Sequence, residues 1–308
     1  MELRQLQYFL TVVEEANFTR AAARLHVAQP GVSAQIRRME RELGQPLLDR
    51  SGRRVTTTEA GEAVLPYARA ALAAVEGIRQ TVDEFTGLVR GRVTIGVVSG
   101  AATEEYDLAP LLADFHDEHP QVEISLTEDT SARMLTALRR GELDLAVVGV
   151  TDDDFLPGTS LQVVIDTPLV AAMTPQDPLL QPAGRTALPL AELAGRALVS
   201  LPRGTGIRGV LERACRQAGF QPRIAFEAAA PSRLTRFAAR GLGVAVLPEI
   251  PPEEAAALGL RTLPLTSPRL SGRIALAWPT DGPTTPAAKA LLARMRKALP
   301  PVEPASRD

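Results

Sequence analysis

"FTRAAARLHVAQPGVSAQIRRMERELG", residues 18–44, decides the fold at the start of this 308-residue chain. The stretch predicts two short helices separated by a break of a few residues, HVAQP. Phe18 anchors the entry to the first helix, and Pro30 fits the first turn of the second, where its missing N–H is no loss. Gly44 ends the second helix. Two helices joined by so short a turn form a helix-turn-helix.

Apolar residues at helical spacing give these helices a shared core. A preceding helix carries a stripe formed by Leu3, Leu6, Leu10 and Val13. The quoted stretch is expected to bury Ala22, Ala23, Leu25, Val32, Ile36, Met39 and Leu43. On the opposite face of the second helix lie Gln29, Ser33 and Arg37, each one turn beyond the last. This helix therefore presents polar and basic groups outward, which is typical of a DNA-recognition helix.

Positive charge is concentrated in the same region. Residues 20–54 hold eight arginines against three acidic residues, a local net of +5, although the whole chain has a formal net charge of −2. The segment PLLDRSGRRVTTTEAG, residues 46–61, predicts two short strands with a turn at Ser51-Gly52, a wing that carries Arg50, Arg53 and Arg54. Arginines on one helix alone would favour a solvated surface helix. A recognition helix beside a basic wing can straddle a groove and its phosphates, which favours DNA binding.

Residues 1–66 resemble the winged helix-turn-helix of LysR-type transcriptional regulators. The run LRQLQYFLTVVEEANFTRAAARLHVAQPGVSAQIRRMERELGQPLLDRSGRRVTTTEAGE follows that motif almost position by position. One departure is Ala28, which stands where the family usually has serine, so a hydroxyl that could cap the helix or touch phosphate is absent.

The resemblance implies double-stranded DNA as the partner of this domain. It implies that base edges or the adjoining backbone are contacted by Gln29, Pro30, Ser33 and Arg37. It also implies that phosphate or the minor groove is contacted by Arg50 and Arg53. Thr19, whose hydroxyl could accept a bond from the first turn of its helix, is expected in the same DNA-binding set.

Residues 58–88 predict a long helix whose apolar residues step by three or four, close to a coiled-coil seam. The seam consists of Leu65, Ala68, Leu72, Val75, Ile78, Val82 and Phe85. One alternative is a helix packed on its own domain, but no second apolar stripe is available to form such a bundle. The pattern therefore favours a dimer helix, and it resembles the linker helix of the LysR-type family. Residues 87–91 look like a hinge.

Strands and helices alternate through the rest of the chain, which indicates parallel sheets covered on both faces. The strands of the first half are GRVTIGVV, VEISLTE and LDLAVVG, and those of the second half are LVAAM, RALVSL, RIAFEA and LGVAVLP. GRIALAW is expected to return to the first half, followed by PAAKALLARMRKAL as a closing helix. Two such lobes resemble periplasmic binding proteins and the effector-binding architecture of the LysR type.

The expected fold class is thus α/β, with an N-terminal winged helix-turn-helix, a long linker helix and a two-lobed, periplasmic-binding-protein-like effector domain. The DNA-binding domain is expected at 1–58, the linker or dimerisation helix with its hinge at 59–90, and the effector-binding domain at 91–300. Within the last, lobe one is expected at about 91–165 and 268–300, and lobe two at about 166–267.

Signals of an enzyme are few. GTGIRG, residues 204–209, matches the G-x-G-x-x-G pattern of dinucleotide-binding loops. Pro202 and Arg203 separate it from the preceding strand and it lies mid-chain, so a loop entering a helix is favoured, one whose N–H groups could hold a small anion. His116 and His119 lie on an acidic helix end and favour a solvated surface over a metal pair. No serine–histidine or paired-carboxylate motif is present. The chain is therefore predicted to be no enzyme and to hold no metal or cofactor.

Donor groups gather at the starts of helices in both lobes. VVSGAATEEY and EDTSARM follow two strands of lobe one, and each opens a helix whose positive dipole end can attract an anion. LPRGTG supplies an arginine from lobe two that could pair with a carboxylate. By resemblance these segments converge on the interlobe cleft, where the expected effector-binding residues are Ser99, Gly100, Ala101, Thr130, Ser131, Gly149, Pro202, Arg203 and Thr205. The expected effector is a small anionic metabolite, although helix capping alone would also explain Ser99 and Thr130.

The single cysteine, Cys215, excludes an intramolecular disulfide and suits a reducing cytosol. No histidine or base lies near it in sequence, so a buried structural role is expected. No apolar run approaches the length of a membrane span, and the start MELRQLQYFL lacks the pattern of a secretion signal. These features predict a cytoplasmic protein without a membrane partner.

Together these patterns predict a bacterial-type, ligand-responsive and sequence-specific transcription regulator that forms a homodimer or homotetramer. An effector between the lobes would bias the lobe and subunit arrangement, and hence the spacing of paired DNA-binding domains. Two-fold symmetry predicts an interrupted inverted repeat as operator. One alternative is a solute-binding protein without a regulatory role, which the basic N-terminal module and the missing signal peptide oppose. Another is a nucleotide-dependent oxidoreductase, which rests only on the glycine pattern.

Overall fold

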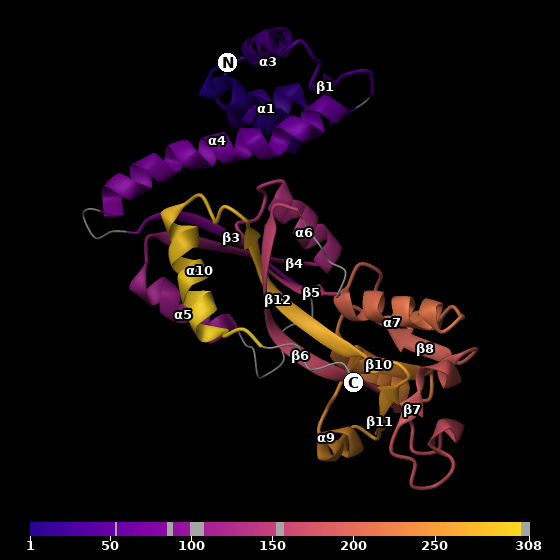
Figure 1. Ribbon diagram of the computed structural model, residues 1–308. Helices are drawn as coiled ribbons and strands as arrows, with labels where there is room; N and C mark the ends of the chain where they lie inside the picture. The colour runs from indigo at the N-terminus through magenta and orange to yellow at the C-terminus, as the bar shows by residue number, and fades with distance from the viewer. Residues whose placement is uncertain (53, 85–88, 99–107, 152–156, 303–308) are drawn as a thin grey trace.

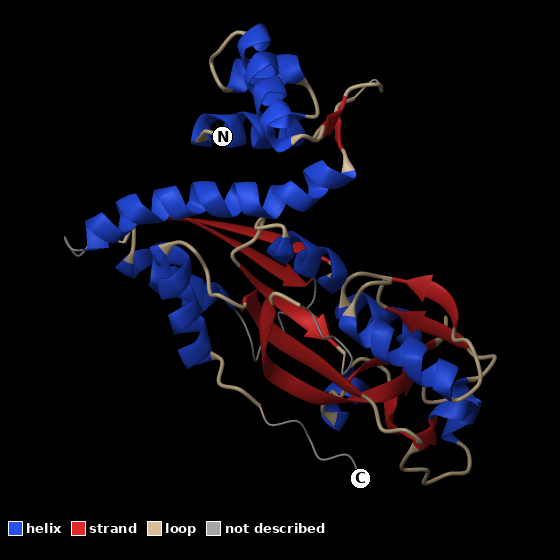
Figure 2. Cartoon of the chain, turned by 45° about the horizontal axis from the view of Figure 1, so that its top comes forward, coloured by secondary structure: helices blue, strands red, loops and turns tan. Residues whose placement is uncertain are grey.

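Figure 1 shows the computed structural model, which describes residues 1–52, 54–84, 89–98, 108–151 and 157–302. A small helical domain lies at one end, a long helix runs beneath it, and a two-lobed α/β domain lies on the other side of that helix (Figures 1 and 2). The small domain consists of α1 (Leu3–Glu15), α2 (Phe18–Arg24), α3 (Gln29–Leu43), β1 (Leu48–Asp49) and β2 (Thr56–Thr57). The predicted helix-turn-helix and its antiparallel two-stranded wing are confirmed, although β1 ends at Asp49 and β2 begins only at Thr56, so more than two residues join the strands.

The helix-turn-helix has its own core, in which Phe9, Ile36 and Met39 are fully buried. The predicted apolar stripes are wrong at three positions, because Leu3, Ala23 and Leu43 are exposed. Leu3 and Leu43 are the terminal residues of α1 and α3. On α2 the buried face is formed by Ala21, Ala22 and Leu25, whose spacing follows the helical repeat and leaves Ala23 outside it.

The long helix is α4 (Glu59–Glu84). Its first turn is capped by the hydroxyl of Thr58, which accepts the N–H of Gly61 at 3.0 Å. Leu65 and Ala68 are buried in the core of the small domain, where α4 packs against α1. Leu72 packs against the same core. The prediction of an intersubunit seam is therefore wrong at Leu65 and Ala68, which are buried in their own domain, whereas it stays a prediction at the half-buried Leu72 and Val75.

A second apolar stripe lies on the exposed face of α4, and it includes Ile78 of the predicted seam. Its members, spaced by three or four residues, are Ala63, Tyr67, Ala70, Ala74 and Ile78. Tyr67 is 76% exposed and Ile78 is 67% exposed. Phe85 and the side chain of Val82, both placed in the predicted seam, lie outside the described part of the chain. Among the side chains of α4 that the structure describes, this second stripe is therefore the apolar surface free to meet another molecule.

Lobe one lies directly below α4 in Figure 1. It consists of β3 (Gly91–Val98), β4 (Val122–Asp129), β5 (Leu145–Val150), β12 (Ser271–Pro279), the first part of β6 (Thr159–Met173), α5 (Leu108–Glu118), α6 (Ser131–Arg139) and α10 (Pro286–Ala298). The strand order is β4-β3-β5-β12-β6. β3 runs parallel to β4 and β5, whereas β12 is antiparallel to β5 and β6. As the sequence predicts, β12 returns to this lobe near the end of the chain.

Lobe two continues the same sheet in the order β6-β10-β8-β9. Its elements are the second part of β6, η2 (Pro178–Leu180), β7 (Leu188–Pro189), η3 (Leu190–Leu193), β8 (Ala197–Ser200), α7 (Gly206–Gln217), β9 (Arg223–Glu227), α8 (Pro231–Ala239), β10 (Val244–Pro248), α9 (Pro252–Ala257) and β11 (Arg261–Thr266). Buried clusters lie on both faces of this sheet, one including Leu211 of α7 and the other Leu234 of α8.

β6 passes through both lobes as one strand, although only its last part, LVAAM, was expected to be a strand. Residues 159–168 pair with β12, and residues 169–172 pair with β10. The expected lobe boundary at residues 165 and 166 falls inside this strand, shortly before the change of partner, and the division there stays a prediction. In the described ranges, no helix is both long and apolar enough to span a membrane.

Candidate nucleic-acid interface and effector cleft

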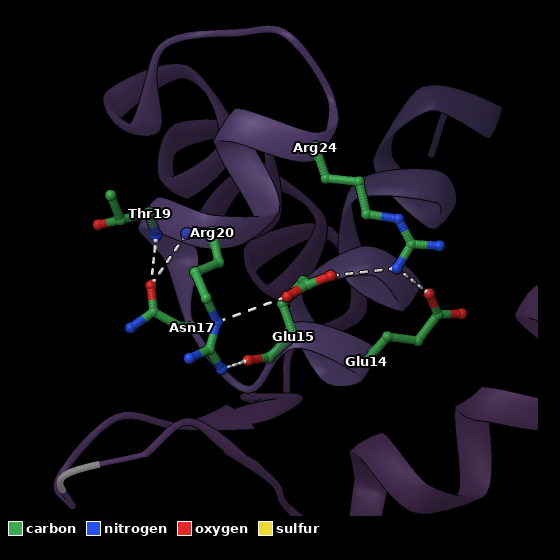
Figure 3. Close-up of polar contacts among 6 residues, drawn as sticks. All are labelled: Glu14, Glu15, Asn17, Thr19, Arg20 and Arg24. Carbon is green, nitrogen blue, oxygen red and sulfur yellow. Dashed lines mark hydrogen bonds and ion pairs between the residues drawn. The ribbon is translucent and has the colours of Figure 1, made fainter.

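The start of α2 is held by a side chain that precedes it. Asn17 has an extended backbone, and its Oδ1 accepts the N–H groups of Thr19 and Arg20 at 2.8 and 3.0 Å (Figure 3). The prediction that Thr19 caps this turn is therefore wrong, since Thr19 is itself helical and exposed. Asparagine is among the preferred N-cap residues, so its position before Phe18 was a usable sequence signal. A DNA contact by Thr19 stays a prediction.

Two arginines of α2 are paired with the end of α1. Arg24 Nη1 lies 2.8 Å from the carboxylate of Glu14 and 3.2 Å from that of Glu15. The Arg20 guanidinium lies 3.4 Å from the Glu15 carboxylate and also donates to the Glu15 carbonyl (Figure 3). Glu14 and Glu15 lie just before residues 20–54, for which the sequence gives a local net charge of +5. Two of the positive charges in that range, those of Arg20 and Arg24, are therefore paired with carboxylates outside it.

The outward face of α3 is open. Gln29, Pro30 and Arg37 are exposed, and Ser33 is half-buried. The helix begins after Ala28, whose side chain makes no capping hydrogen bond. A hollow of about 730 Å³ beside this face is lined by Ala34, Arg37, Glu40, Arg41, Gly44, Gln45 and Pro46. Arg37 and Arg41 therefore border a concave surface next to the predicted base-reading positions.

Glu40 of α3 holds the wing in place. Its Oε1 accepts the N–H groups of Leu47 and Leu48 at 3.0 and 3.2 Å, and its Oε2 lies 2.7 Å from Arg50. The Arg50 guanidinium also lies 5.0 Å from the ring centroid of Phe18, a cation–π contact. Arg50 thus fixes the wing to α2 and α3, and its contact with phosphate stays a prediction. The role of Glu40 depends on the wing folding back, so no local sequence pattern indicates it.

Carboxylates divide the arginines of the small domain into two groups. Those with an acidic partner are Arg20, Arg24, Arg38 and Arg50. Among the residues of this domain that the structure describes, those without one are Arg4, Arg37, Arg41 and Arg54. Arg53, a predicted phosphate contact, lies outside the described residues. Most of the positive charge left for a polyanion is therefore on α3 and the wing.

At the predicted effector cleft, the start of α6 meets lobe two directly. Ser131 is buried, and its Oγ accepts the N–H of Gly149 at 3.0 Å. The N–H of Ala132 donates to the carbonyl of Gly204 in lobe two at 3.1 Å. Thr130 lies against the same glycine. The structure therefore brings Thr130, Ser131 and Gly149 together, in contact with the opposite lobe.

The glycines of GTGIRG are explained by this contact. Gly204 has a left-handed backbone, with φ +85°. A Cβ at Gly206 would lie 2.7 Å from the carbonyl carbon of Gly149, and one at Gly209 would lie 3.2 Å from a methyl carbon of Thr151. The pattern thus serves a turn and the close approach of two backbones. It needs no dinucleotide.

The remaining predicted effector residues are only partly brought to the cleft. The Thr205 hydroxyl donates to the Pro202 carbonyl at 2.8 Å, inside its own loop. Arg203 lies 3.5 Å from Glu212 with its side chain 82% exposed, so it pairs within lobe two. Ser99, Gly100 and Ala101 lie outside the described residues.

A buried arginine, not predicted from the sequence, anchors this loop. Arg208 is 3% exposed and donates to the carbonyl of Leu201 at 3.1 Å. It also donates to Glu212 at 2.8 Å and to Glu227 at 2.9 Å. Glu212 is one helical turn away and could have been noticed, but Glu227 comes from a separate strand.

His119 has a structural contact, since its ring centroid lies 4.8 Å from that of Phe115. Over the described ranges, no three histidine, cysteine, aspartate or glutamate side chains gather as a metal site would require.

Cys215 is fully buried. Burial, together with the negative charge of Glu212, raises the pKa of its thiol from 9.0 to about 11, so about one molecule in a thousand carries the thiolate at pH 8. We expect Ellman's reagent to label the native protein at pH 8 at least about 100-fold more slowly than the protein unfolded in guanidinium chloride. The Cys215→Ala variant gives the blank. Equal labelling rates in the two states would contradict a buried thiol.

These features define a class of protein. A winged helix-turn-helix with free arginines on its outward helix, joined by one long helix to a two-lobed α/β domain, is the architecture of a DNA-binding transcription regulator modulated by a small ligand. Residues 3–62 match the family model described as "Bacterial regulatory helix-turn-helix protein, lysR family", and residues 86–300 match "LysR substrate binding domain". The chain therefore belongs to the LysR family of transcriptional regulators, as its N-terminal motif predicts.

Individual relatives agree with this assignment. The chain is 36% identical over 250 residues to the HTH-type transcriptional regulator ShiR of Corynebacterium glutamicum, covering 80% of this chain and 82% of that one. It is 30% identical over 286 residues to the DNA-binding transcriptional dual regulator OxyR of Escherichia coli, covering 92% and 91%. The solved structure of a full-length OxyR variant from Pseudomonas aeruginosa superimposes with a TM-score of 0.69 at 25% identity, covering 96% and 95%.

Proposed function

We propose that this regulator binds an interrupted inverted repeat in double-stranded DNA as a homodimer or homotetramer, and that a small anionic metabolite between its lobes alters that binding. One observation carries the first part. Among the residues that the structure describes, no carboxylate pairs with Arg37 or Arg41, which lie one and two turns beyond Ser33 on α3. Base reading by α3, with phosphate contacts from the neighbouring arginines, follows from this placement.

The start of α6 supports a ligand that offers hydrogen-bond acceptors. The N–H of Ala132 donates across the cleft to the carbonyl of Gly204, and a ligand carboxylate could take the place of that carbonyl. The positive end of the α6 dipole favours a negative group there. Asp129 lies at the same helix end, where the N–H of Thr130 keeps the pKa of its carboxyl below the usual value, but its charge is balanced by Arg133 at 3.3 Å. Ligand entry would part the lobes at Gly204, which would link occupancy to lobe arrangement.

A regulator without catalytic activity, working in the cytoplasm where DNA lies, is the function we favour over the two alternatives. The alternative of a nucleotide-dependent oxidoreductase depends on the G-x-G-x-x-G pattern alone, and those glycines lie where one lobe packs against the other. The solute-binding protein does not account for a DNA-binding domain that contacts lobe one through α4.

Substitutions in the exposed stripe of α4 test whether this stripe joins two subunits and whether the oligomer binds paired half-sites. We expect the double variant Tyr67→Glu with Ile78→Glu to split the oligomer, because unpaired charge would be buried at the helix contact. Light scattering would report the change in mass. Duplexes selected from a random library should contain two half-sites for the wild-type protein, whereas the variant should select a single half-site.

Leu258→Glu is the matched control, since Leu258 is an exposed leucine of lobe two, far from α4 in sequence and 41% exposed. It should leave the mass unchanged. A double variant that keeps the full wild-type mass and still selects paired half-sites would refute the α4 contact.

A further inference from the structure

α6 makes contacts at both of its ends. At its start, Ala132 bonds to Gly204 of lobe two. Its nine residues span about 13 Å. At its far end, the turn formed by residues 140–142 lies against α4, as Figures 1 and 2 both show for α6 and the long helix. One short helix therefore connects the cleft with the helix that carries the DNA-binding domain.

Arg69 of α4 receives the end of α6. Its Nη1 donates to the carbonyl of Arg140 at 3.0 Å and lies 3.0 Å from the carboxylate of Glu142, with the Arg69 side chain only 15% exposed. Arg140 is the C-cap residue, so its carbonyl lies at the negative end of α6, where a cation is favoured. Gly141 has a left-handed backbone with φ +63°, which favours glycine in this turn.

Glu62 lies two turns before Arg69 on the same face of α4. Its Oε2 is 2.9 Å from Nη2 of Arg140. Its Oε1 accepts the hydroxyl of Thr57, which belongs to the wing strand β2. A single carboxylate thus contacts the effector domain with one oxygen and the wing with the other.

From these contacts we infer that the arrangement of the lobes is coupled to the position of the wing through an α4–α6 junction, formed by Glu62, Arg69, Arg140 and Glu142. The inference rests on the proposed function, in which the cleft is the effector site. When the lobes part at Gly204, α6 moves as a rigid helix and displaces its far end against α4. Glu62 and Arg140 are 41% and 45% exposed, so their pair is weak enough to break and re-form in a switch.

A thermodynamic cycle on the full-length protein tests the junction. Gly206→Ala opens the cleft without any ligand, because its Cβ would meet the backbone of Gly149. The probe is a duplex selected by the wild-type protein from a random library, and fluorescence anisotropy gives Kd. We expect Gly206→Ala to change Kd by about fivefold in the wild-type junction. The change should be less than about twofold when Arg69→Gln and Arg140→Gln are also present.

Three further variants keep the test decisive. If Gly206→Ala does not fold, Arg213→Gln replaces it, because it removes the 2.7 Å bond that Arg213 of lobe two donates to Thr151 and so weakens the contact between the lobes. Glu62→Gln is a milder junction variant that still offers an acceptor to Thr57. Arg139→Gln is the matched control, since Arg139 is exposed on α6 and has no ion-pair partner among the described residues. In that background the fivefold change should persist.

The outcomes separate the inference from the proposed function. The same change of Kd with and without the junction substitutions would overturn the inference and leave the proposed function standing. A wild-type protein that selects no duplex would refute the proposed function, and the coupling with it.

Discussion

Replacement of Arg37 by alanine is expected to weaken operator binding by roughly 5- to 150-fold, because a base contact by arginine contributes about 1–3 kcal/mol. Arg37 is exposed on α3, one turn beyond Ser33, and no carboxylate in the described part of the chain pairs with it. The measurement is the anisotropy-derived Kd at a fixed salt concentration, on a duplex selected by the wild-type protein and on a random duplex. If Arg37 reads bases, the selected duplex should lose more affinity than the random one.

Arg38 provides the matched control for this substitution. It is the next residue of the same helix and is also exposed, but its Nε lies 3.2 Å from the carboxylate of Glu42. Arg38→Ala should change Kd by less than about threefold, because a charge already paired within the domain contributes little to a polyanion contact. An effect as large as that of Arg37→Ala would show that intrachain pairing does not select the DNA-contacting arginines.

Replacement of Gly206 by alanine is expected to destabilise the effector domain by about 1–3 kcal/mol, a cost typical of overpacking. The added Cβ would lie 2.7 Å from the carbonyl carbon and 2.8 Å from Cα of Gly149. These are backbone atoms of a central strand and cannot rotate away as a side chain would. The lobes must therefore shift apart. Differential scanning calorimetry should show a melting temperature lower by about 2–10 °C, and the amide of Ala132 should exchange faster in hydrogen exchange.

Gly209→Ala is the control for this second substitution. Gly209 lies one turn further along α7, and its added Cβ would meet only the methyl carbon of Thr151, at 3.2 Å. Alanine also gains about 0.8–1 kcal/mol over glycine in a helix interior. Its net effect should therefore be small. A Gly206→Ala protein with the wild-type melting temperature and unchanged exchange at Ala132 would mean that the two backbones do not touch.

Features of short range were readable from the sequence alone. The helix-turn-helix followed from apolar spacing and from Pro30 and Gly44, which mark the ends of α3. The wing and the alternation of strands and helices followed from local patterns of the same kind. Each depends on residues within about one helical turn or one strand of one another, where backbone geometry decides the outcome.

The tertiary structure alone decided which surfaces are free. Leu65 and Ala68, which looked like part of an intersubunit seam, are buried in the small domain where α4 packs against α1, and the exposed stripe around Tyr67 remains. Arg50 is a basic residue of the wing, as expected of a phosphate contact. Once the wing has folded back, however, its guanidinium is paired with Glu40 and packs on the ring of Phe18. The buried and the exposed face of α4 both carry apolar residues at helical spacing, so no local pattern tells which one is free. The paired and unpaired arginines of the small domain likewise carry the same charge and cannot be told apart from the sequence.

The effector cleft shows the same limit at longer range. The sequence indicated helix starts rich in donors, and α6 does place Ser131 beside Gly149. It did not indicate that the donor of Ala132 is already used by Gly204, or that Arg140 meets Glu62. These partners lie more than 70 residues apart in the chain. Only the packed molecule brings such partners together. The free energy of burying a polar or charged group depends on the neighbour that replaces water as its hydrogen-bonding partner, and that neighbour is distant in the sequence.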